Sequence, residues 1–542
     1  MPLTLRGLVL VAALPLLACT AAAPPSGGDA AASTTPQPGG TFHLTVLSSP
    51  THLFPFTDIS TANSATVSGV YETLLRYDYS GDFRDELKIL PAVAERWERK
   101  DDTTYLFTLR KGLKFHDGSD VTAEDVVWSL NYLRDPANKF RRATALAALD
   151  QIEAVDPSTV KMTSKEASPV FIDRITDRQP IVLSKKAFDR GVDFEKEPIG
   201  TGPLKIGTWD RRSGATLVKN EAYWDSGKPY LNKVQLFYNF DFAQMIAAFT
   251  AKKADVVKVS NKAEFDQIQT LTPDAVGDPF SQNNSVSLML KLDRPPFNDV
   301  RVRRAMHLAL DRQEMIETLS FGLGAMDPPG MNGGRGGGWA ISQEELAKLP
   351  GYRRPKDPDL VEARRLLTEA GHPSGFKFSL QYNASGVTRR ASEAQVVAAQ
   401  LAKVGIQAEL APKEDAVSRK ADLDGDFSVT LGNFSYDPDS EAWPFWLHSK
   451  QAKARTGVDD KELDALIDGQ VLEMDQAKRK GQWIAIQRLL LDKLYVVPMV
   501  THKGFVALQS YVHGWGDNRG GQAVNQSWAS TWLDQDRVPP GR

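Results

Sequence analysis

Residues 94–126 read AERWERKDDTTYLFTLRKGLKFHDGSDVTAEDV, and this stretch holds the strongest fold signals in the chain. The short apolar run from Tyr105 to Leu109 predicts a β-strand, and a turn with a glycine follows it. Thr122 and Asp125 have the spacing of a helix capping box, and apolar residues follow them at helical intervals. The stretch therefore predicts a strand, a turn and a capped helix in that order.

Beyond this stretch, helical and strand patterns alternate along the second half of the chain. Asp357 is predicted to cap a helix whose first residue is Pro358, and Gly371 lies just past its end. This alternation is typical of an α/β protein with mixed sheets. Further helices are predicted over residues 302–319 and 391–404, and strands over 41–47, 377–382, 407–410 and 427–431.

Length and composition limit the class of protein. A chain of 542 residues is too long for one compact core and suggests about two or three domains. Its hydrophobic content of 42% and charged content of 25% are those of an ordinary globular protein. The net charge of -3 argues against a nucleic-acid partner, because such partners favour strongly basic surfaces.

The only cysteine, Cys19, follows a short apolar run over residues 8–17. This run is too short to span a bilayer and has the length of a signal-peptide core. It ends in the letters LLAC, which resemble the bacterial lipobox, in which the cysteine carries diacylglycerol. We therefore predict a lipoprotein signal peptide over residues 1–18, lipidation of Cys19 and a flexible, lipid-anchored tether over 19–40. An ordinary cleaved signal peptide is the alternative.

Four blocks of residues resemble, in order and spacing, the signature of the family 5 extracellular solute-binding proteins. These proteins are the dipeptide, oligopeptide and nickel receptors of ABC importers, and the resemblance extends from Gly40 to the C-terminus. The blocks are Ala94-x-x-Trp97 through Thr122-Ala123-x-Asp125-Val126; Pro198-Ile199-Gly200-Thr201-Gly202-Pro203 with Asn220-x-x-Tyr223-Trp224; Pro296-Phe297-x-Asp299-x-Arg301-x-Arg303 with Ala309-x-Asp311-Arg312; and Tyr352 through Glu369-Ala370-Gly371.

The resemblance implies a two-lobed fold of the periplasmic-binding-protein type, with an extra inserted domain and three structural domains in all. It also implies that the lobes close on a solute about crossings near Asn284 and Val497. The implied segments are 41–76, 187–280 and 498–542 for domain I, 77–186 for the inserted domain II, and 281–497 for domain III, the second lobe.

The implied function is solute capture outside the cytoplasmic membrane, in the periplasm or on the outer face of that membrane. The protein would then deliver a peptide or peptide-like solute to ABC permease subunits. It would act as a monomer, without a metal or cofactor and without nucleic acid.

One departure from the family bears on the ligand. In the peptide-binding members, an acidic residue four positions before a proline pairs with the ligand's α-ammonium, and here Phe434 stands at that position. A buried ammonium needs a carboxylate partner, which a phenyl ring cannot supply. Either Asp437, Asp439 or Glu441 supplies the charge, or the ligand lacks a free α-amine, as an oligosaccharide, an opine-like conjugate or a blocked peptide would.

Other candidate ligand contacts lie in a loop after the first strand and at the crossing between lobes. The loop holds Thr51 and His52, and the crossing offers the amides of Asn283 and Asn284, which suit polar ligands. The full set of candidate ligand-binding residues is Thr51, His52, Asn283, Asn284, Phe434, Tyr436 and Asp437.

The rival class is a lipid-anchored secreted hydrolase. The sequence contains no Gly-x-Ser-x-Gly and no His-Glu-x-x-His motif, and lipidation would consume its only thiol. A hydrolase mechanism that uses paired carboxylates stays open, because no feature of the sequence selects one pair among its 68 acidic residues. We therefore predict that the protein is not an enzyme. A chaperone-like or adhesive role would suit the same tethered architecture.

Overall fold

The computed structural model describes residues 35–54, 56–57, 60–78, 88–140, 143–176, 180–259, 262–281, 284–331, 339–384, 389–435, 446–516 and 527–542. The elements from Pro36 to Arg542 form one unit of mutually contacting structure. The predicted signal peptide, Cys19 and all but the last residues of the predicted tether lie outside the described residues. Among the described residues, no helix is both long and apolar enough to cross a bilayer.

The largest sheet has eight strands in the order β12-β19-β11-β1-β10-β9-β8, with β14 paired to β19. β1 runs parallel to its neighbours β10 and β11, and its Phe42 is fully buried and stacks on Trp515 at 4.9 Å. The strands are β1 (Thr41–Thr45), β8 (Leu204–Asp210), β9 (Gly214–Lys219), β10 (Lys233–Phe237), β11 (Val256–Val259), β12 (Val276–Ser281), β14 (Gly324–Met326) and β19 (Val500–Leu508). The associated helices are α1 (Thr61–Val67), α5 (Phe242–Thr250) and α6 (Lys262–Leu271).

A four-stranded antiparallel sheet, in the order β4-β5-β7-β6, is built from the stretch that opens the sequence argument. The predicted strand and the helix with its capping box are both confirmed. Its elements are β4 (Ala94–Arg99), β5 (Thr104–Leu109), α2 (Ala123–Arg134), β6 (Leu149–Asp156), β7 (Thr159–Ser164), α3 (Phe171–Thr176) and α4 (Lys185–Asp189), with 3-10 turns at Pro136–Asn138 and Ala143–Leu146. Two short pairs complete this half, β2 (Leu75–Tyr77) with β3 (Ile89–Pro91) and β20 (Val512–His513) with β21 (Trp532–Leu533).

Changing Asp125 to alanine is expected to destabilise this part of the fold by about 1.5–3 kcal/mol, the range for hydrogen bonds to a charged group. The Asp125 carboxylate is buried and accepts from the Thr122 amide at 2.9 Å, the Thr122 hydroxyl at 2.8 Å and the Lys185 amide at 2.9 Å. Urea unfolding measures the loss. Glu124→Ala is the matched control, because Glu124 is an exposed neighbour in the same helical turn. Equal losses in the two variants would contradict the role assigned to Asp125.

The third large sheet has five strands in the order β16-β15-β17-β13-β18. β15 is parallel to both β16 and β17, while β13 is antiparallel to β17 and β18, so this sheet is mixed, as the alternating pattern predicted. The strands are β13 (Asn284–Leu290), β15 (Lys377–Asn383), β16 (Gln407–Lys413), β17 (Val429–Ser435) and β18 (Val496–Pro498). The helices are α7 (Val300–Ala309), α8 (Arg312–Ser320), α9 (Gln343–Leu346), α10 (Asp357–Glu369), α11 (Arg389–Ala402), α12 (Asp415–Asp424), α14 (Ser449–Arg455), α15 (Lys461–Leu472) and α16 (Gln476–Lys493).

Two details of the predicted helices are wrong. The helix predicted over residues 302–319 is two helices, because Leu310 is extended and the Asp311 side chain caps α8 by accepting from the Glu314 amide at 2.9 Å. Asp357 is the first residue of α10 and not its cap, a position that Lys356 takes.

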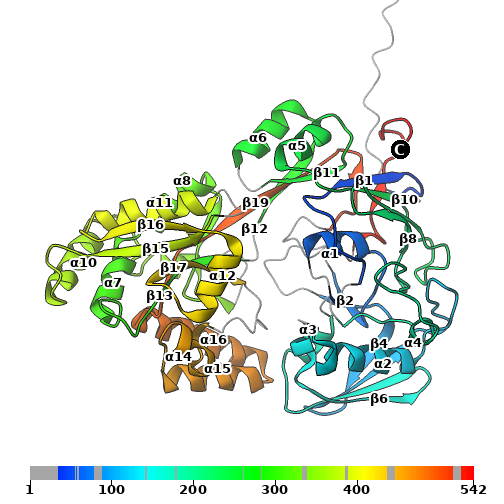
Figure 1. The fold of residues 1–542 in the computed structure, drawn as a ribbon, viewed down its shortest axis with the longest axis horizontal. Coiled ribbons are helices and arrows are strands. Elements are labelled where there is room, and N and C mark those ends of the chain that lie inside the picture. Colours follow the sequence, from blue (N-terminus) through cyan, green and yellow to red (C-terminus); the bar gives the residue numbers. More distant parts are fainter. Residues whose placement is uncertain are drawn as a thin grey trace, which may run out of the picture. The chain divides into compact units, whose positions relative to one another are not determined.

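Two strand connections join these sheets. β12 of the eight-stranded sheet continues into β13 of the five-stranded sheet, and β18 of the five-stranded sheet continues into β19 of the eight-stranded sheet (Figure 1). We call the four-stranded sheet and the eight-stranded sheet without β14, together with their helices, the first lobe. The five-stranded sheet with its helices forms the second lobe, to which we also assign β14, because its Met326 belongs to that core. The boundaries of the three implied domains stay a prediction.

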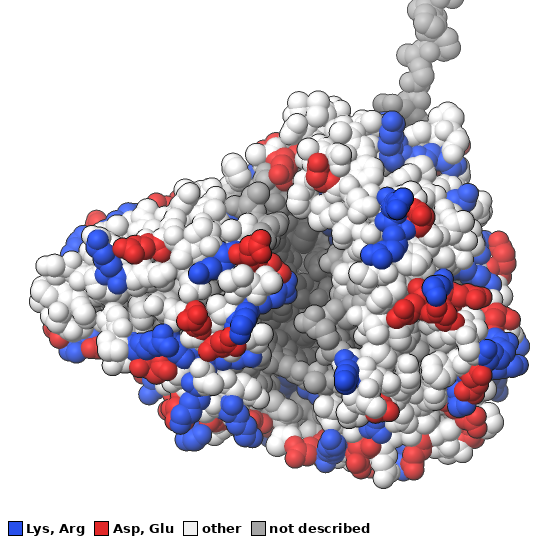
Figure 2. All heavy atoms as spheres, in the orientation of Figure 1, with Lys and Arg blue, Asp and Glu red and all other residues white. Residues whose placement is uncertain are grey.

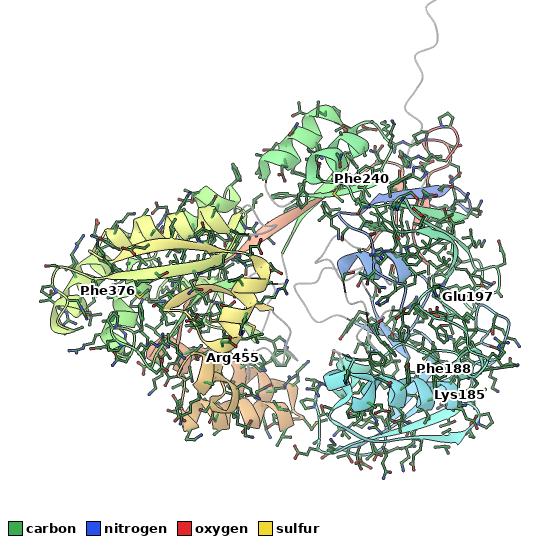
Figure 3. All side chains as sticks on the ribbon, viewed as in Figure 1. Lys185, Phe188, Glu197, Phe240, Phe376 and Arg455 are labelled. Atoms are coloured by element: carbon green, nitrogen blue, oxygen red, sulfur yellow. The ribbon has the colours of Figure 1, made fainter. Side chains whose placement is uncertain are left out.

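Buried apolar residues form separate clusters in these two lobes, plus a small third one. One large cluster joins the eight- and four-stranded sheets, and another fills the second lobe. Phe376 packs against the second cluster, and Phe240 packs against the third, which lies between α5, α6 and β19 (Figure 3). Separate cores joined by two strands make an arrangement in which the lobes can move as bodies.

Candidate functional site

The second lobe brings several chain ends to one edge of its sheet. Because β15 and β17 are parallel and β13 is antiparallel to β17, the carboxyl ends of β15 and β17 meet the amino end of β13 there. At this edge Asn284 lies opposite Ser435, and Ser285 lies opposite Phe434. The carboxyl edge of parallel strands is where open α/β sheets place their ligands. The structure thus brings two of the predicted site residues, Asn284 and Phe434, to one edge.

The loop after β1 lies at the corresponding edge of the first lobe, because β1 is parallel to its neighbours β10 and β11. In this loop Thr51 is exposed and His52 is half-buried. The ring nitrogens of His52 lie 3.2 Å from the Thr57 hydroxyl, and its carbonyl accepts from the Asn63 side chain at 2.8 Å. α1 therefore holds this loop in place through Asn63, which is buried.

The remaining predicted residues lie outside the described residues. They are Asn283, Tyr436, Asp437 and the side chains of Asn284 and Phe434, together with Asp439, Glu441 and Cys19. Their roles as ligand contacts, or as a lipid attachment point, stay predictions.

A group of charged residues that the sequence argument missed lies just beyond β15. Arg389 and Arg390 begin α11, and both donate to the carboxylate of Glu393, at 3.1 Å from Arg389 Nε and 2.6 Å from Arg390 Nη1. Nε2 of His502, on β19, lies 3.0 Å from Glu393 Oε1. We call Arg389, Arg390, Glu393 and His502 the charge cluster.

Burial and charge set the ionisation of this cluster. Burial by itself would raise the pKa of Glu393, but Arg390, His502 and Arg389 outweigh it and lower the pKa to about 2. Burial lowers the pKa of His502, and the two guanidinium groups lower it further, so the imidazole is neutral near pH 7. The cluster thus places two guanidinium groups beside one ionised carboxylate and one neutral imidazole.

Glu393 indicates which nitrogen of His502 carries the proton. A carboxylate only accepts hydrogen bonds, so the proton belongs on Nε2, which lies 3.0 Å from Glu393 Oε1 in a contact that lacks hydrogen-bond geometry. Nδ1 then accepts from the hydroxyl of Ser320, at 2.5 Å. Ser320 and His502 are both buried, so this row of groups is shielded from water.

One local signal marks this cluster in the sequence. Two adjacent arginines at the start of a helix oppose the helix dipole, which favours acidic residues at that end. Such an arrangement needs a nearby anion, and Glu393 follows at helical spacing from both. The pattern Arg389-Arg390-x-x-Glu393 therefore indicates that the first turn of this helix binds an anion. It does not predict the contact with His502.

The exposed charges are mixed in sign. Lys and Arg side chains alternate with Asp and Glu over the face shown in Figure 2, and this face is hollowed between the two lobes. Such mixing on this face fits the small net charge of -3. Among the described residues, no group of three or more His, Cys, Asp or Glu side chains is arranged to hold a metal ion.

Comparison with known proteins places the fold and the family. Residues 88–455 match the family described as bacterial extracellular solute-binding proteins, family 5 Middle. The glutathione-binding protein GsiB of Escherichia coli (strain K12) is 26% identical over 476 residues, which cover 84% of this chain and 87% of GsiB.

Solved structures share the fold. The periplasmic binding protein DppA from Helicobacter pylori, in complex with the peptide STSA, is 22% identical with a TM-score of 0.72, covering 92% of this chain and 99% of DppA. The binding protein AgaA from A. tumefaciens R10, in complex with agropinic acid, is 23% identical with a TM-score of 0.71, covering 91% and 99%. These likenesses confirm the two-lobed α/β fold that the sequence predicted. Because the family match spans more than half of the chain, this protein belongs to the bacterial extracellular solute-binding proteins of family 5.

Proposed function

We propose that this receptor captures a peptide-like solute through the solute's carboxylate and delivers it to the permease subunits of an ABC importer. The charge cluster carries the proposal, because it places two guanidinium groups at the start of α11, which follows β15 at the sheet edge where Asn284 and Phe434 also lie. Arg389 is the member with access to solvent, since its side chain is 15% exposed while Glu393 is 1% exposed. A guanidinium group binds a carboxylate through two parallel hydrogen bonds, which suits this task.

The ligands named for the relatives share this chemistry. Glutathione, the peptide STSA and agropinic acid are three different molecules, and each carries a carboxylate. A neutral oligosaccharide carries none, so it would offer the guanidinium group of Arg389 no carboxylate to bind. The charge cluster thus favours a peptide-like or opine-like solute over the oligosaccharide alternative.

The carboxylate proposal is compatible with both hypotheses about the amine end. A solute with a free α-amine would need Asp437, Asp439 or Glu441 as its partner, whereas an opine-like or blocked solute would lie against Phe434 without one. Both kinds of solute offer a carboxylate to Arg389.

Isothermal titration calorimetry with a matched panel tests the proposal. We expect glutathione, Ser-Thr-Ser-Ala or agropinic acid to bind, and the C-terminal amide of a peptide that binds to lose about tenfold or more in affinity. Maltotriose, as a neutral oligosaccharide, is expected not to bind. Binding of maltotriose as tight as that of any carboxylate solute would overturn the proposed ligand class.

The proposal also includes the absence of catalysis. Ser320, His502 and Glu393 follow one another in the order of a serine-hydrolase triad. However, both oxygens of Glu393 accept from guanidinium groups, and Ser320 is buried. We therefore assign this row a structural role in a monomeric binding protein.

We propose further that diacylglycerol on Cys19 anchors the receptor to the membrane. Changing Cys19 to serine is expected to move the protein from the membrane fraction to the soluble fraction, because one lipid-modified residue is its proposed anchor. Fractionation followed by immunoblotting measures the shift, with Ser26→Ala in the predicted tether as the control. Retention of the serine variant in membranes after a high-salt wash would show that the anchor is elsewhere.

A further inference from the structure

β19 carries the chain from the second lobe into the first, and the strand it is paired with changes from β14 to β12 near His502 and Lys503. Val500 and His502 lie opposite Met326 and Gly324 of β14, whose Met326 belongs to the core of the second lobe. From Lys503 onward the strand is paired with β12, with Ser281 opposite Lys503, although the Lys503 amide also donates to the Leu323 carbonyl at 3.3 Å, just before β14. His502 is therefore the last residue of the crossing strand that lies opposite β14 itself.

Groups of the second lobe form hydrogen bonds with the residues that precede His502 on the crossing strand. The guanidinium group of Arg312, which is fully buried, donates to the Pro498 carbonyl at 2.9 Å from Nε and 2.6 Å from Nη2. The Asp327 amide donates to the Met499 carbonyl at 3.2 Å, and the Thr501 hydroxyl donates to Asp327 Oδ1 at 2.6 Å. Residues 498–501 are thus tied to the second lobe, and a pivot between the lobes belongs after them.

His502 lies between residues 498–501, which are bonded to the second lobe, and the other members of the charge cluster. Its backbone is the end point of the pairing with β14, and its ring contacts Ser320 of α8 and Glu393 of α11. Glu393 in turn accepts from Arg389 and Arg390. One side chain therefore links the proposed carboxylate-binding groups to the residue that precedes the change of partner.

We infer that His502 is a positioning residue that couples the guanidinium groups of Arg389 and Arg390 to the pivot between the lobes, which lies at Lys503 and Ser281. This inference rests on the proposed function for the role of the two arginines. When a solute carboxylate binds Arg389, the hydrogen bonds from Arg389 and Arg390 to Glu393 change. The Glu393–His502 contact transmits that change to the crossing strand. The pivot is displaced from the crossing near Val497 that the family resemblance implied.

Distance measurement between the lobes tests this role without requiring a bound solute. Cys19 is the only cysteine, so the full chain with Cys19→Ser accepts spin labels at Lys196→Cys in the first lobe and Lys420→Cys in the second. Both lysines are exposed, at 78% and 77%. Pulsed electron paramagnetic resonance then gives the distribution of distances between the lobes for each variant, with and without glutathione as the probe.

In His502→Leu we expect the population of the main distance in the solute-free protein to fall by about twofold or more, because the strand is released from Glu393. His502→Gln is expected to restore the distribution, because its amide keeps a polar N–H group facing Glu393. Leu463→Ala, a buried change on α15, is the control for lost stability and is expected to leave the distribution unchanged.

An unchanged distribution in His502→Leu would overturn the inference, and so would a broadening that His502→Gln fails to reverse or that Leu463→Ala reproduces. Failure of the proposed function has a different signature. The unmodified protein would then bind none of the carboxylate solutes in calorimetry, while the solute-free distance distributions would still decide the role of His502.

Discussion

Changing Arg389 to methionine is expected to weaken the binding of a carboxylate solute by about 2–5 kcal/mol, which is roughly 30-fold or more. The methionine keeps much of the side chain's apolar volume but removes the guanidinium group that we propose meets the solute. Glu393 keeps the guanidinium group of Arg390 at 2.6 Å, so the buried carboxylate stays paired and the fold is expected to persist. Calorimetry on the solutes that bind the unmodified protein measures the loss.

Arg365→Met is the matched control for this experiment. Arg365 is 52% exposed on α10 and pairs with Glu362 at 2.6 Å, so it also loses an ion pair, but away from the sheet edge. It is expected to leave solute affinity unchanged. If Arg389→Met bound these solutes as tightly as Arg365→Met, the carboxylate would be recognised elsewhere in the protein.

Changing Glu393 to glutamine is expected to lower the free energy of unfolding by about 3–5 kcal/mol, the usual cost of removing one partner from a buried ion pair. The glutamine leaves two guanidinium groups, with side chains 8% and 15% exposed, without a carboxylate between them. Denaturant unfolding followed by circular dichroism measures the change. Glu344→Gln, which breaks an ion pair with a side chain 84% exposed, is the control and is expected to lose less than about 1 kcal/mol.

The pH dependence of stability gives the same prediction a second measurement. The pKa of Glu393 is lowered from 4.5 to about 2, so its ionised form is favoured by folding. Its contribution is therefore complete above pH 4.5 and is lost as the pH falls through about 2. Glu393→Gln is expected to lack this component of acid unfolding. A loss of stability no larger than that of Glu344→Gln, with an unaltered acid profile, would contradict the role of Glu393.

The sequence by itself determined the parts of the fold that depend on local signals. The strand β5 and the capping box of α2 followed from local residue spacing, and the mixed sheet of the second lobe followed from the alternation of elements. The signature blocks, whose family the match confirms, led to the two-lobed fold and to solute binding. Such features need only residues close together in the chain, or a pattern of spaced residues that many sequences share.

Only the tertiary structure decided how the charge cluster is assembled. Glu393 lies on α11 and His502 on β19, and sheet pairing between distant parts of the chain brings them to 3.0 Å. Leu310 and Asp311 likewise separate two helices, with Asp311 as the cap of the second, although the apolar pattern continues through them. Apolar periodicity records which face of an element is buried, but it does not record which polar side chains from other elements meet there. In this protein those polar contacts determine both the proposed carboxylate site and the proposed pivot.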